Sequence, residues 1–304
     1  MKDNKFVLAI DWGHTNLRMA LVKIIKDKYE IKNLTITDCA LVKDHDSIFK
    51  LIDAIFSKSL MFKIDGIAVS TAGAVDNKRK LILLSEVPPG GYALKQDLEE
   101  RYGKKVILIN DGNAGVYAEK YFGNNNAENL IYITISSGIG AGIISDSKLL
   151  TGENGAAGEI GRLLIGDPSS EIGLCTWESV ASGNKLPQYF GKWADRHKKI
   201  VEPHARAKEI FELYRQGDKN AVHFINDLNK LNSMVVSNMV VTYNPEAIVF
   251  GGSVMVNNGD ILLSGLLKSI KSYLPIPKMH ITSLGDNVCL LGAAAYFKEF
   301  NAII

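Results

Sequence analysis

Short apolar runs, interrupted by polar or glycine-bearing turns, mark the beginning of the chain. The runs at 6–10, 17–22 and 29–37 are rich in residues that favour strands, and this pattern predicts a meander of antiparallel strands. Over 44–59 the apolar residues recur at the spacing of a helix, so a helix with one buried face is predicted there. Its apolar positions are Ile48, Leu51, Ile52 and Ile55.

Further along the chain, apolar runs at 64–70 and 106–109 predict two more strands. A helix is expected after Asp111, and Gly123 would end it. Apolar residues recur at helical spacing over 218–243 and predict a long amphipathic helix, for which core packing is the favoured interpretation.

The middle of the chain repeats the pattern of its beginning. The runs 130–135 and 141–145 predict two strands joined by a glycine-rich turn, as do the runs on either side of Gly13. Two hairpins of similar build suggest two related α/β halves with a cleft between them, where ligands commonly bind. The sequence similarity of the halves is weak, so the duplication is a hypothesis.

Composition narrows the class of protein. A chain of 304 residues, 46% hydrophobic and 22% charged, can bury a sizeable core and suits about two domains. The net charge of +2 comes without a basic block that could follow a nucleic-acid backbone. We therefore expect no nucleic-acid partner.

The lack of a recognisable targeting signal and the spacing of the cysteines favour a cytoplasmic protein. The first apolar run meets Asp11 too soon for a signal peptide, and no run approaches ~18 apolar residues, so no membrane association is expected. Cys39, Cys175 and Cys289 lie too far apart for a disulfide framework or a CxxC metal knuckle, which fits a reducing compartment.

The first glycine turn, "DWGHTNLR", could bind phosphate. Gly13 lets backbone amides and the Thr15 hydroxyl approach a phosphate, and Asp11 could hold a hydrated Mg²⁺ ion. An ordinary hairpin turn explains these residues equally well.

Two more glycine clusters strengthen the case for a nucleotide. The turn "SSGIGAG" leaves one face bare for phosphate contact, and Gly251 and Gly252 follow a buried-type strand where adenine and ribose could enter. Each cluster alone could be packing, but together they favour nucleotide binding without a Walker-type lysine loop. The predicted set is Asp11, Gly13, Thr15, Asn16, Ser137, Gly138, Gly140, Gly251 and Gly252.

The segment "LINDGNAG" offers a candidate general base. Asp111 follows a predicted strand and precedes a helix, where its carboxylate could take a proton from a substrate hydroxyl. Asn110 and Asn113 could fix the acceptor by hydrogen bonds. The alternative is a helix N-cap aspartate, which would not exclude catalysis.

Together these segments resemble the ROK family of bacterial sugar kinases and repressors, within the actin, Hsp70 and hexokinase superfamily. The block "ITISSGIGAGIISDSKLLTGENGAAGEIG" is similar to the second phosphate motif and its following signature, the most specific match. "AIDWGHTNLRMALV" resembles the first phosphate motif, with His14 where a second glycine is usual. "NPEAIVFGGSV" resembles the adenosine motif, "GAAAYF" the closing helix, and "VSTAGAVD" a sugar-side segment.

The resemblance implies an α/β, actin-like (ribonuclease H-like) two-domain ATPase fold with a central cleft. The N-terminal α/β domain would comprise 1–112 plus 292–304, and the C-terminal α/β domain 113–291. It further implies ATP- and Mg²⁺-dependent phosphorylation of a sugar hydroxyl with Asp111 as general base, and a homodimer. The implied sugar-binding residues are Gly73, Asn110, Asp111, Glu159 and Glu178.

The segment after Glu159 departs from the family's pattern. Relatives place a zinc-binding histidine and three cysteines here, but this chain has Arg162 at the histidine position and Ser169, Glu171 and Thr176 at the cysteine positions, with Cys175 out of register. Because structural zinc needs about four such ligands, no structural zinc is predicted. Arg162 could instead pair with Glu171 or Glu178, bind the sugar, or face solvent.

Three functions are weighed. A hexose or hexose-derivative kinase is favoured; glucose is the usual substrate, and N-acetylmannosamine, fructose, allose and β-glucosides are used by relatives. A repressor would need an added helix-turn-helix, and only five residues precede Phe6. A catalytically inactive sugar-binding regulatory protein is the alternative that His14 and the altered zinc segment keep open.

Overall fold

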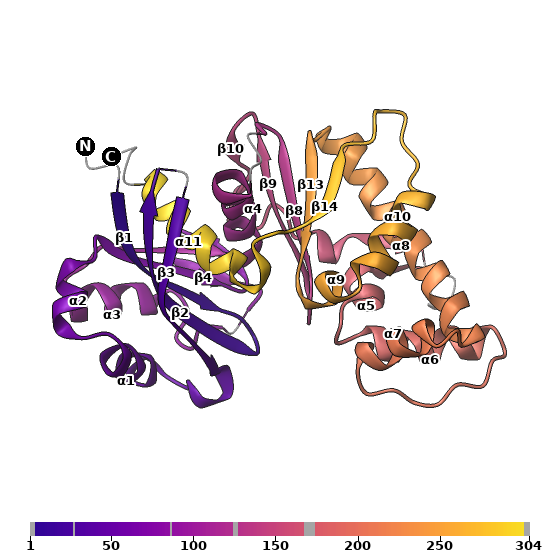
Figure 1. Cartoon of the computed structure of the whole chain (residues 1–304), viewed down its shortest axis with the longest axis horizontal. Helices are drawn as coiled ribbons and strands as arrows, with labels where there is room; N and C mark the ends of the chain where they lie inside the picture. The colour runs from indigo at the N-terminus through magenta and orange to yellow at the C-terminus, as the bar shows by residue number, and fades with distance from the viewer. Residues whose placement is uncertain (1–3, 27, 86, 124–126, 167–173, 301–304) are drawn as a thin grey trace. The chain divides into compact units, whose positions relative to one another are not determined.

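The computed structural model describes residues 4–26, 28–85, 87–123, 127–166 and 174–300. Contacts divide the chain into two compact units, and Figure 1 labels most of their helices and strands. The first unit comprises Met1–Asn126, Leu149–Gly158 and Ser283–Ile304, and the second Ala127–Lys148 and Glu159–Thr282. Among the described residues, no helix combines the length and the apolar composition that a membrane span requires.

The first unit is built on a five-stranded sheet with the order β3-β2-β1-β4-β7. β1 pairs antiparallel with β2 and parallel with β4, so an antiparallel hairpin continues into parallel strands. The bounds are β1 Asn4–Trp12, β2 Asn16–Ile25, β3 Lys28–Asp38, β4 Gly66–Thr71 and β7 Val106–Asn110. A second, small sheet pairs β5 Ala74–Asp76 with β6 Leu81–Leu83.

Helices α1 His45–Ile55, α2 Lys58–Lys63, α3 Ala93–Tyr102, α4 Asp111–Phe122 and α11 Val288–Phe300 complete this unit. The meander and the strands at 64–70 and 106–109 are confirmed. The helix expected over 44–59 is corrected: it ends at Ile55, because Ser57 accepts a hydrogen bond from the Leu60 amide and so caps a separate helix.

Helix α11 packs against both α4 and the buried central strand β1. The approach of the two helices is close, because a Cβ atom added to Gly292 would lie 1.7 Å from the carbonyl oxygen of Ala114. Only glycine fits at this position without moving one of the helices. Since Asp111 begins α4, the C-terminal helix supports the element that carries the candidate base.

The second unit repeats this plan with a sheet of order β10-β9-β8-β13-β14. β8 pairs antiparallel with β9 and parallel with β13, as β1 does with β2 and β4. The bounds are β8 Leu130–Ile135, β9 Ile139–Ser145, β10 Lys148–Leu149, β13 Ala247–Gly251 and β14 Lys278–Ile281. The identical strand order supports the hypothesis of two related α/β halves.

The α-helices among the described residues of the second unit are α5 Trp177–Ala181, α6 Leu186–Arg196, α7 Ala207–Arg215, α8 Lys219–Tyr243, α9 Ser253–Asn257 and α10 Gly259–Ser269. The long helix predicted over 218–243 is confirmed as α8, and Asp218 caps its first turn. It packs against α10 and α7, which agrees with the core-packing interpretation. A small hairpin pairs β11 Leu164–Gly166 with β12 Leu174–Thr176.

Candidate functional site

Two carboxylates lie at the carboxyl edge of the first unit's sheet. The parallel strands β1, β4 and β7 end together at this edge, and in register Asp11 lies opposite Ser70 and Thr71 opposite Asn110. Asp111 follows directly as the first residue of α4. Ligands of α/β sheets bind at this kind of edge, so the topology brings Asp11 and Asp111 to the edge where a ligand would bind.

Asp111 is held in place by its neighbours. Its Oδ1 atom accepts hydrogen bonds from the Gly112 amide at 2.8 Å and from Asn110 Nδ2 at 3.0 Å. Burial raises the pKa of Asp111, whereas the Gly112 amide and the positive charge of His14 lower it. A carboxylate with a raised pKa is a stronger proton acceptor than an exposed aspartate.

The N-cap interpretation of Asp111 is corrected. The cap of α4 is Asn110, whose Oδ1 accepts from the Asn113 amide at 3.1 Å. Asn110 Nδ2 also donates to the Gly73 carbonyl at 3.0 Å. Asparagine therefore satisfies the helix end, which leaves the Asp111 carboxylate for other chemistry.

Asp11 is only 7% exposed and lies within the electrostatic reach of Asp111. Burial raises its pKa to about 7; the Arg18 charge opposes this rise and the Asp111 charge adds to it. Arg18 Nη1 lies 3.8 Å from Asp11 Oδ2. Arg18 was missed in the sequence, although hairpin register alone places it opposite Asp11.

The turn between β1 and β2 is tight, and backbone hydrogen bonds hold it, one within the turn and one from a residue outside it. The Gly13 amide donates to the Asn16 carbonyl at 3.1 Å, and the Cys39 amide donates to the Thr15 carbonyl at 2.9 Å. His14 and Thr15 are exposed at the tip of the turn. Their side chains can therefore reach a ligand while the backbone is fixed.

Gly73 lies in a turn that only glycine can form. Its φ is +86°, and an added Cβ would lie 2.5 Å from the Leu83 carbonyl oxygen. Together with the hydrogen bond from Asn110, this brings Gly73, Asn110 and Asp111 into one hydrogen-bonded group.

In the second unit, the turn between β8 and β9 contacts Glu178. Glu178 Oε2 accepts from the Ile139 amide at 2.7 Å, and a Cβ on Gly138 would lie 2.8 Å from the same oxygen. Ser137 accepts at its carbonyl from the Asn184 amide at 3.3 Å. The residue implied for sugar binding thus touches the turn predicted for phosphate.

Glu159 and Arg162 belong to a short 3-10 turn that packs against β9. Glu159 is the N-cap of the 3-10 helix Ile160–Arg162 and Arg162 is its last residue; a Cβ on Gly161 would lie 2.4 Å from the Ile139 carbonyl oxygen. Ile139 therefore contacts both this helix and Glu178. Arg162 Nε is 3.5 Å from Glu159 Oε2, and its side chain is 60% exposed.

Arg162 consequently pairs with a residue that the sequence did not suggest. Its expected partner Glu171, like Ser169, lies outside the described residues, and Glu178 is occupied by the Ile139 amide. Thr176 caps helix α5 through its hydroxyl, which accepts from the Ser179 amide at 3.3 Å. Trp177 is fully buried, and its Nε1 donates to Asn232 Oδ1 on α8 at 2.8 Å.

The third glycine cluster lies at the carboxyl edge of the second sheet. Gly251 pairs in register with Thr134, and Gly252 adopts a φ of +84° with no room for a Cβ beside the Ile135 carbonyl. Ile135 leads directly into the turn that holds Ser137 and Gly138, and Gly140 lies in β9 opposite Thr134. This edge therefore holds the five residues of the second unit that are predicted to bind the nucleotide.

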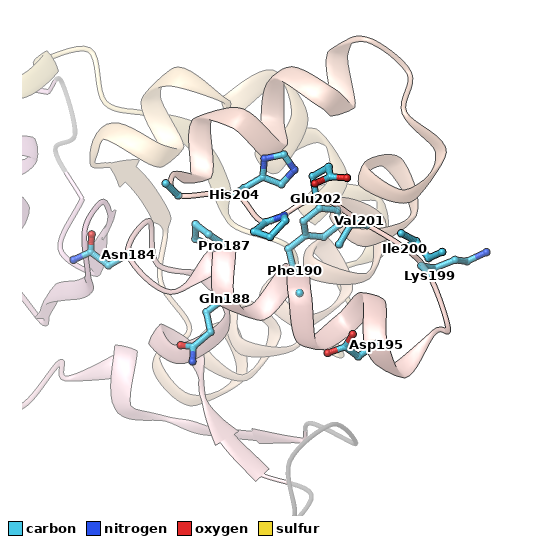
Figure 2. A pocket seen from close by; sticks show the side chains of 13 residues that line it. Asn184, Pro187, Gln188, Phe190, Asp195, Lys199, Ile200, Val201, Glu202 and His204 are labelled. Carbon is cyan, nitrogen blue, oxygen red and sulfur yellow. The ribbon is translucent and has the colours of Figure 1, made fainter.

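A pocket of about 660 Å³ lies elsewhere in the second unit. Figure 2 shows the side chains that line it. The pocket is lined by α6 and the segment after it, among others by Gln188, Phe190, Glu202 and His204. None of the predicted site residues lines it. The candidate carboxylates and glycine turns lie instead at the carboxyl edge of the sheet within each unit.

Comparison with known proteins identifies the family. The sequence profile of the ROK family matches residues 7–300. The chain is 26% identical to a glucokinase of Thermotoga maritima, covering 96% of this chain and 97% of that protein. It is 30% identical to an N-acetylmannosamine kinase of Pasteurella multocida, covering 96% of each.

A solved structure agrees over the same length. It is a ROK family glucokinase from Streptomyces griseus in complex with glucose and AMPPNP, with a TM-score of 0.76 and 25% identity, covering 96% of this chain and 98% of that one. The two-domain, actin-like α/β fold class is thereby confirmed. The chain belongs to the ROK family.

Proposed function

We propose that the chain is an ATP-dependent kinase that phosphorylates a hydroxyl of a hexose or hexose derivative. The observation that carries the proposal is the pair of carboxylates, Asp11 and Asp111, gathered at one sheet edge with raised pKa values. The relatives named above are sugar kinases, and one of them binds glucose and an ATP analogue.

Asp111 is assigned as the general base. Phosphoryl transfer chiefly requires an oriented hydroxyl, a nearby proton acceptor and positive or dipolar groups around the phosphate. The Asp111 carboxylate would take the proton of the attacking hydroxyl, while Asn110 and the Gly112 amide keep it in position. Asn110 and Gly73 would also contact the sugar.

Asp11 is assigned to Mg²⁺, through water. Its oxygen donor, its burial and its neighbouring Asp111 make a site that favours a hard cation, because a nearby positive charge would keep both carboxylates ionised. Bound there, Mg²⁺ would neutralise phosphate charge. Gly13, Thr15 and Asn16 would bind phosphate, and Ser137, Gly138, Gly140, Gly251 and Gly252 the rest of the nucleotide.

The identity of the sugar substrate is a separate part of the proposal. Glucose and N-acetylmannosamine are the substrates that the relatives' names suggest. Glu159 and Glu178 are assigned to sugar hydroxyls, and Arg162 acts on the sugar through Glu159, to which it is close. We further propose that the segment around these residues binds no zinc, since Arg162 replaces its histidine, and that the chain forms a homodimer.

A coupled assay of ADP release tests the proposal. Purified protein with ATP and Mg²⁺ is given glucose, N-acetylmannosamine, fructose, allose and β-glucosides in turn. One sugar should give kcat/KM at least about 10-fold above the others, since an unpaired polar group discriminates strongly. ADP release at background with every sugar, together with sugar binding by calorimetry, would establish the inactive sugar-binding protein instead.

Replacing Arg162 by alanine should raise the KM for the sugar by about 3- to 10-fold, because Glu159 loses the guanidinium that orients it. The melting temperature should hardly change, since exposed ion pairs contribute about 1 kcal/mol or less. Steady-state kinetics and thermal melts measure both effects.

Arg206→Ala is the matched control for Arg162→Ala. Arg206, the N-cap residue of α7, forms a pair with Glu209 at 3.3 Å, also three residues apart, and α7 holds no predicted site residue. It should leave the sugar KM unchanged. If Arg162→Ala behaves the same way, Arg162 merely faces solvent.

Replacing His14 by glutamine should move the acid limb of kcat/KM to higher pH. The positive charge of His14 lowers the pKa of Asp111, so its loss lets that pKa rise further. More Asp111 is then protonated, and inactive as a base, at a given acidic pH. The variant and the wild type should converge at alkaline pH; a limb that does not move would show that His14 and Asp111 are uncoupled.

A further inference from the structure

Two histidines and an aspartate of the second unit converge outside the candidate site. His197 directly follows α6, and His223 and Asp227 lie one turn apart on α8. One potential ligand atom from each of the three lies within 4.8 Å of the other two.

The hydrogen bonding of His197 sets its tautomer. Its Nδ1 lies 2.8 Å from the Trp193 carbonyl oxygen, which can only accept, so Nδ1 carries the proton. In the neutral ring Nε2 then holds the lone pair. A metal-binding histidine typically donates its other ring N–H to a carbonyl in this way.

The spacing of His223 and Asp227 suits a tetrahedral ion. His223 Nε2 lies 3.5 Å from Asp227 Oδ2. Two ligands about 2.0–2.2 Å from a tetrahedral zinc ion lie about 3.3–3.5 Å apart, so these atoms need little adjustment. Residues at i and i+4 on a helix share one face, which makes α8 a suitable support.

Trp193 supports all three residues. Its ring stacks on His197 with centroids 4.5 Å apart and meets the edge of His223 at 5.1 Å. Its Nε1 donates to Asp227 Oδ2 at 3.1 Å, which orients the carboxylate. Trp193 is itself 3% exposed, so the ligands are backed by a fixed side chain.

We infer that His197, His223 and Asp227 bind a divalent transition-metal ion of the zinc type. Two imidazoles and one carboxylate are ligands that zinc accepts, and three protein ligands leave a fourth position for water. The competing interaction is the ion pair between Lys230 Nζ and Asp227 Oδ1 at 2.8 Å. The Lys230 side chain is 68% exposed and can turn into solvent when the ion binds.

Such an ion would link the end of α6 to α8. The segment that follows His197 lines the cavity in Figure 2, where the His204 ring stacks on Phe190 at 5.9 Å. The ion would therefore hold the start of the segment that forms the cavity wall. The sequence predicts no structural zinc in the altered segment after Glu159. The inferred site would instead bind a zinc ion at residues that come later in the chain.

Calorimetric titration of metal-stripped protein with Zn²⁺, in buffer without Mg²⁺ or nucleotide, tests the inference. The wild type should bind one ion per chain and gain roughly 5 °C in Tm at 100-fold excess over Kd. His223→Gln should weaken binding at least about 10-fold. Because His223 is half exposed, this variant should fold normally.

His204→Gln is the matched control, since His204 belongs to the same region and pairs with Glu209 at 3.6 Å instead. It should bind Zn²⁺ as the wild type does. Binding of equal affinity in His223→Gln would place the ion elsewhere and overturn the inference, as would the absence of saturable binding to the wild type. Neither outcome depends on kinase activity.

Discussion

Asp111→Asn is expected to lower kcat by about 10²–10⁴-fold, the range that loss of a general base typically produces. The amide has the shape of the carboxylate, and its oxygen can still accept from the Gly112 amide and from Asn110. It cannot take the proton of the attacking hydroxyl. The KM for ATP should therefore stay nearly constant, and steady-state kinetics would separate the two parameters.

The same substitution should not destabilise the protein. Burial raises the pKa of Asp111 in the folded state, so the folded state disfavours the ionised form. The stability that this shift confers is present below the unfolded pKa and is lost as pH rises through the folded pKa. Asparagine cannot ionise, so Tm relative to the wild type should be higher at pH 8 than at pH 5.

Asp46→Asn provides the matched control for Asp111→Asn. Asp46 lies in the first turn of α1, as Asp111 lies in the first turn of α4, but it is exposed and far along the chain from the site. Both changes remove a charge from a helix N-terminus, so kcat should fall only in Asp111→Asn. Normal turnover by Asp111→Asn would exclude the assigned base.

The hydrophobic pattern predicted the elements that position the candidate base. β-prone runs located the strands β1, β4 and β7, and the rule that parallel strands share an edge then accounts for the proximity of Asp11 and Asp111. The short helix α3 was not predicted, because its buried face consists of only two residues, Leu94 and Leu98, and the periodic signal is weak.

Contacts between distant segments could not be predicted from the sequence. The Ile139 amide, the hydrogen-bond partner of Glu178, is a backbone group that every residue except proline has, so the residue type does not mark it. His223 and Asp227 show a visible i, i+4 spacing, but His197 joins them only because α6 packs beside α8. Tertiary packing, and not local pattern, decides such groups.

Gly292→Ala should cause the largest loss of stability, about 3 kcal/mol or more, equivalent to a fall in Tm of roughly 10 °C. The added methyl group would lie 1.7 Å from the Ala114 carbonyl oxygen, so α11 and α4 must move apart. Activity should fall as well, because α4 begins at Asp111. Urea titration and thermal melts measure the loss.

Gly191→Ala is the control that separates this clash from the general effect of alanine in a helix. Gly191 lies within α6, and a Cβ there meets nothing within 4 Å, so alanine should stabilise the helix by about 0.5–1 kcal/mol. The obstructing atom at Gly292 is a backbone oxygen, so the double variant Gly292→Ala with Ala114→Gly should not recover stability. Recovery would mean that side chains, and not backbones, set the distance between α4 and α11.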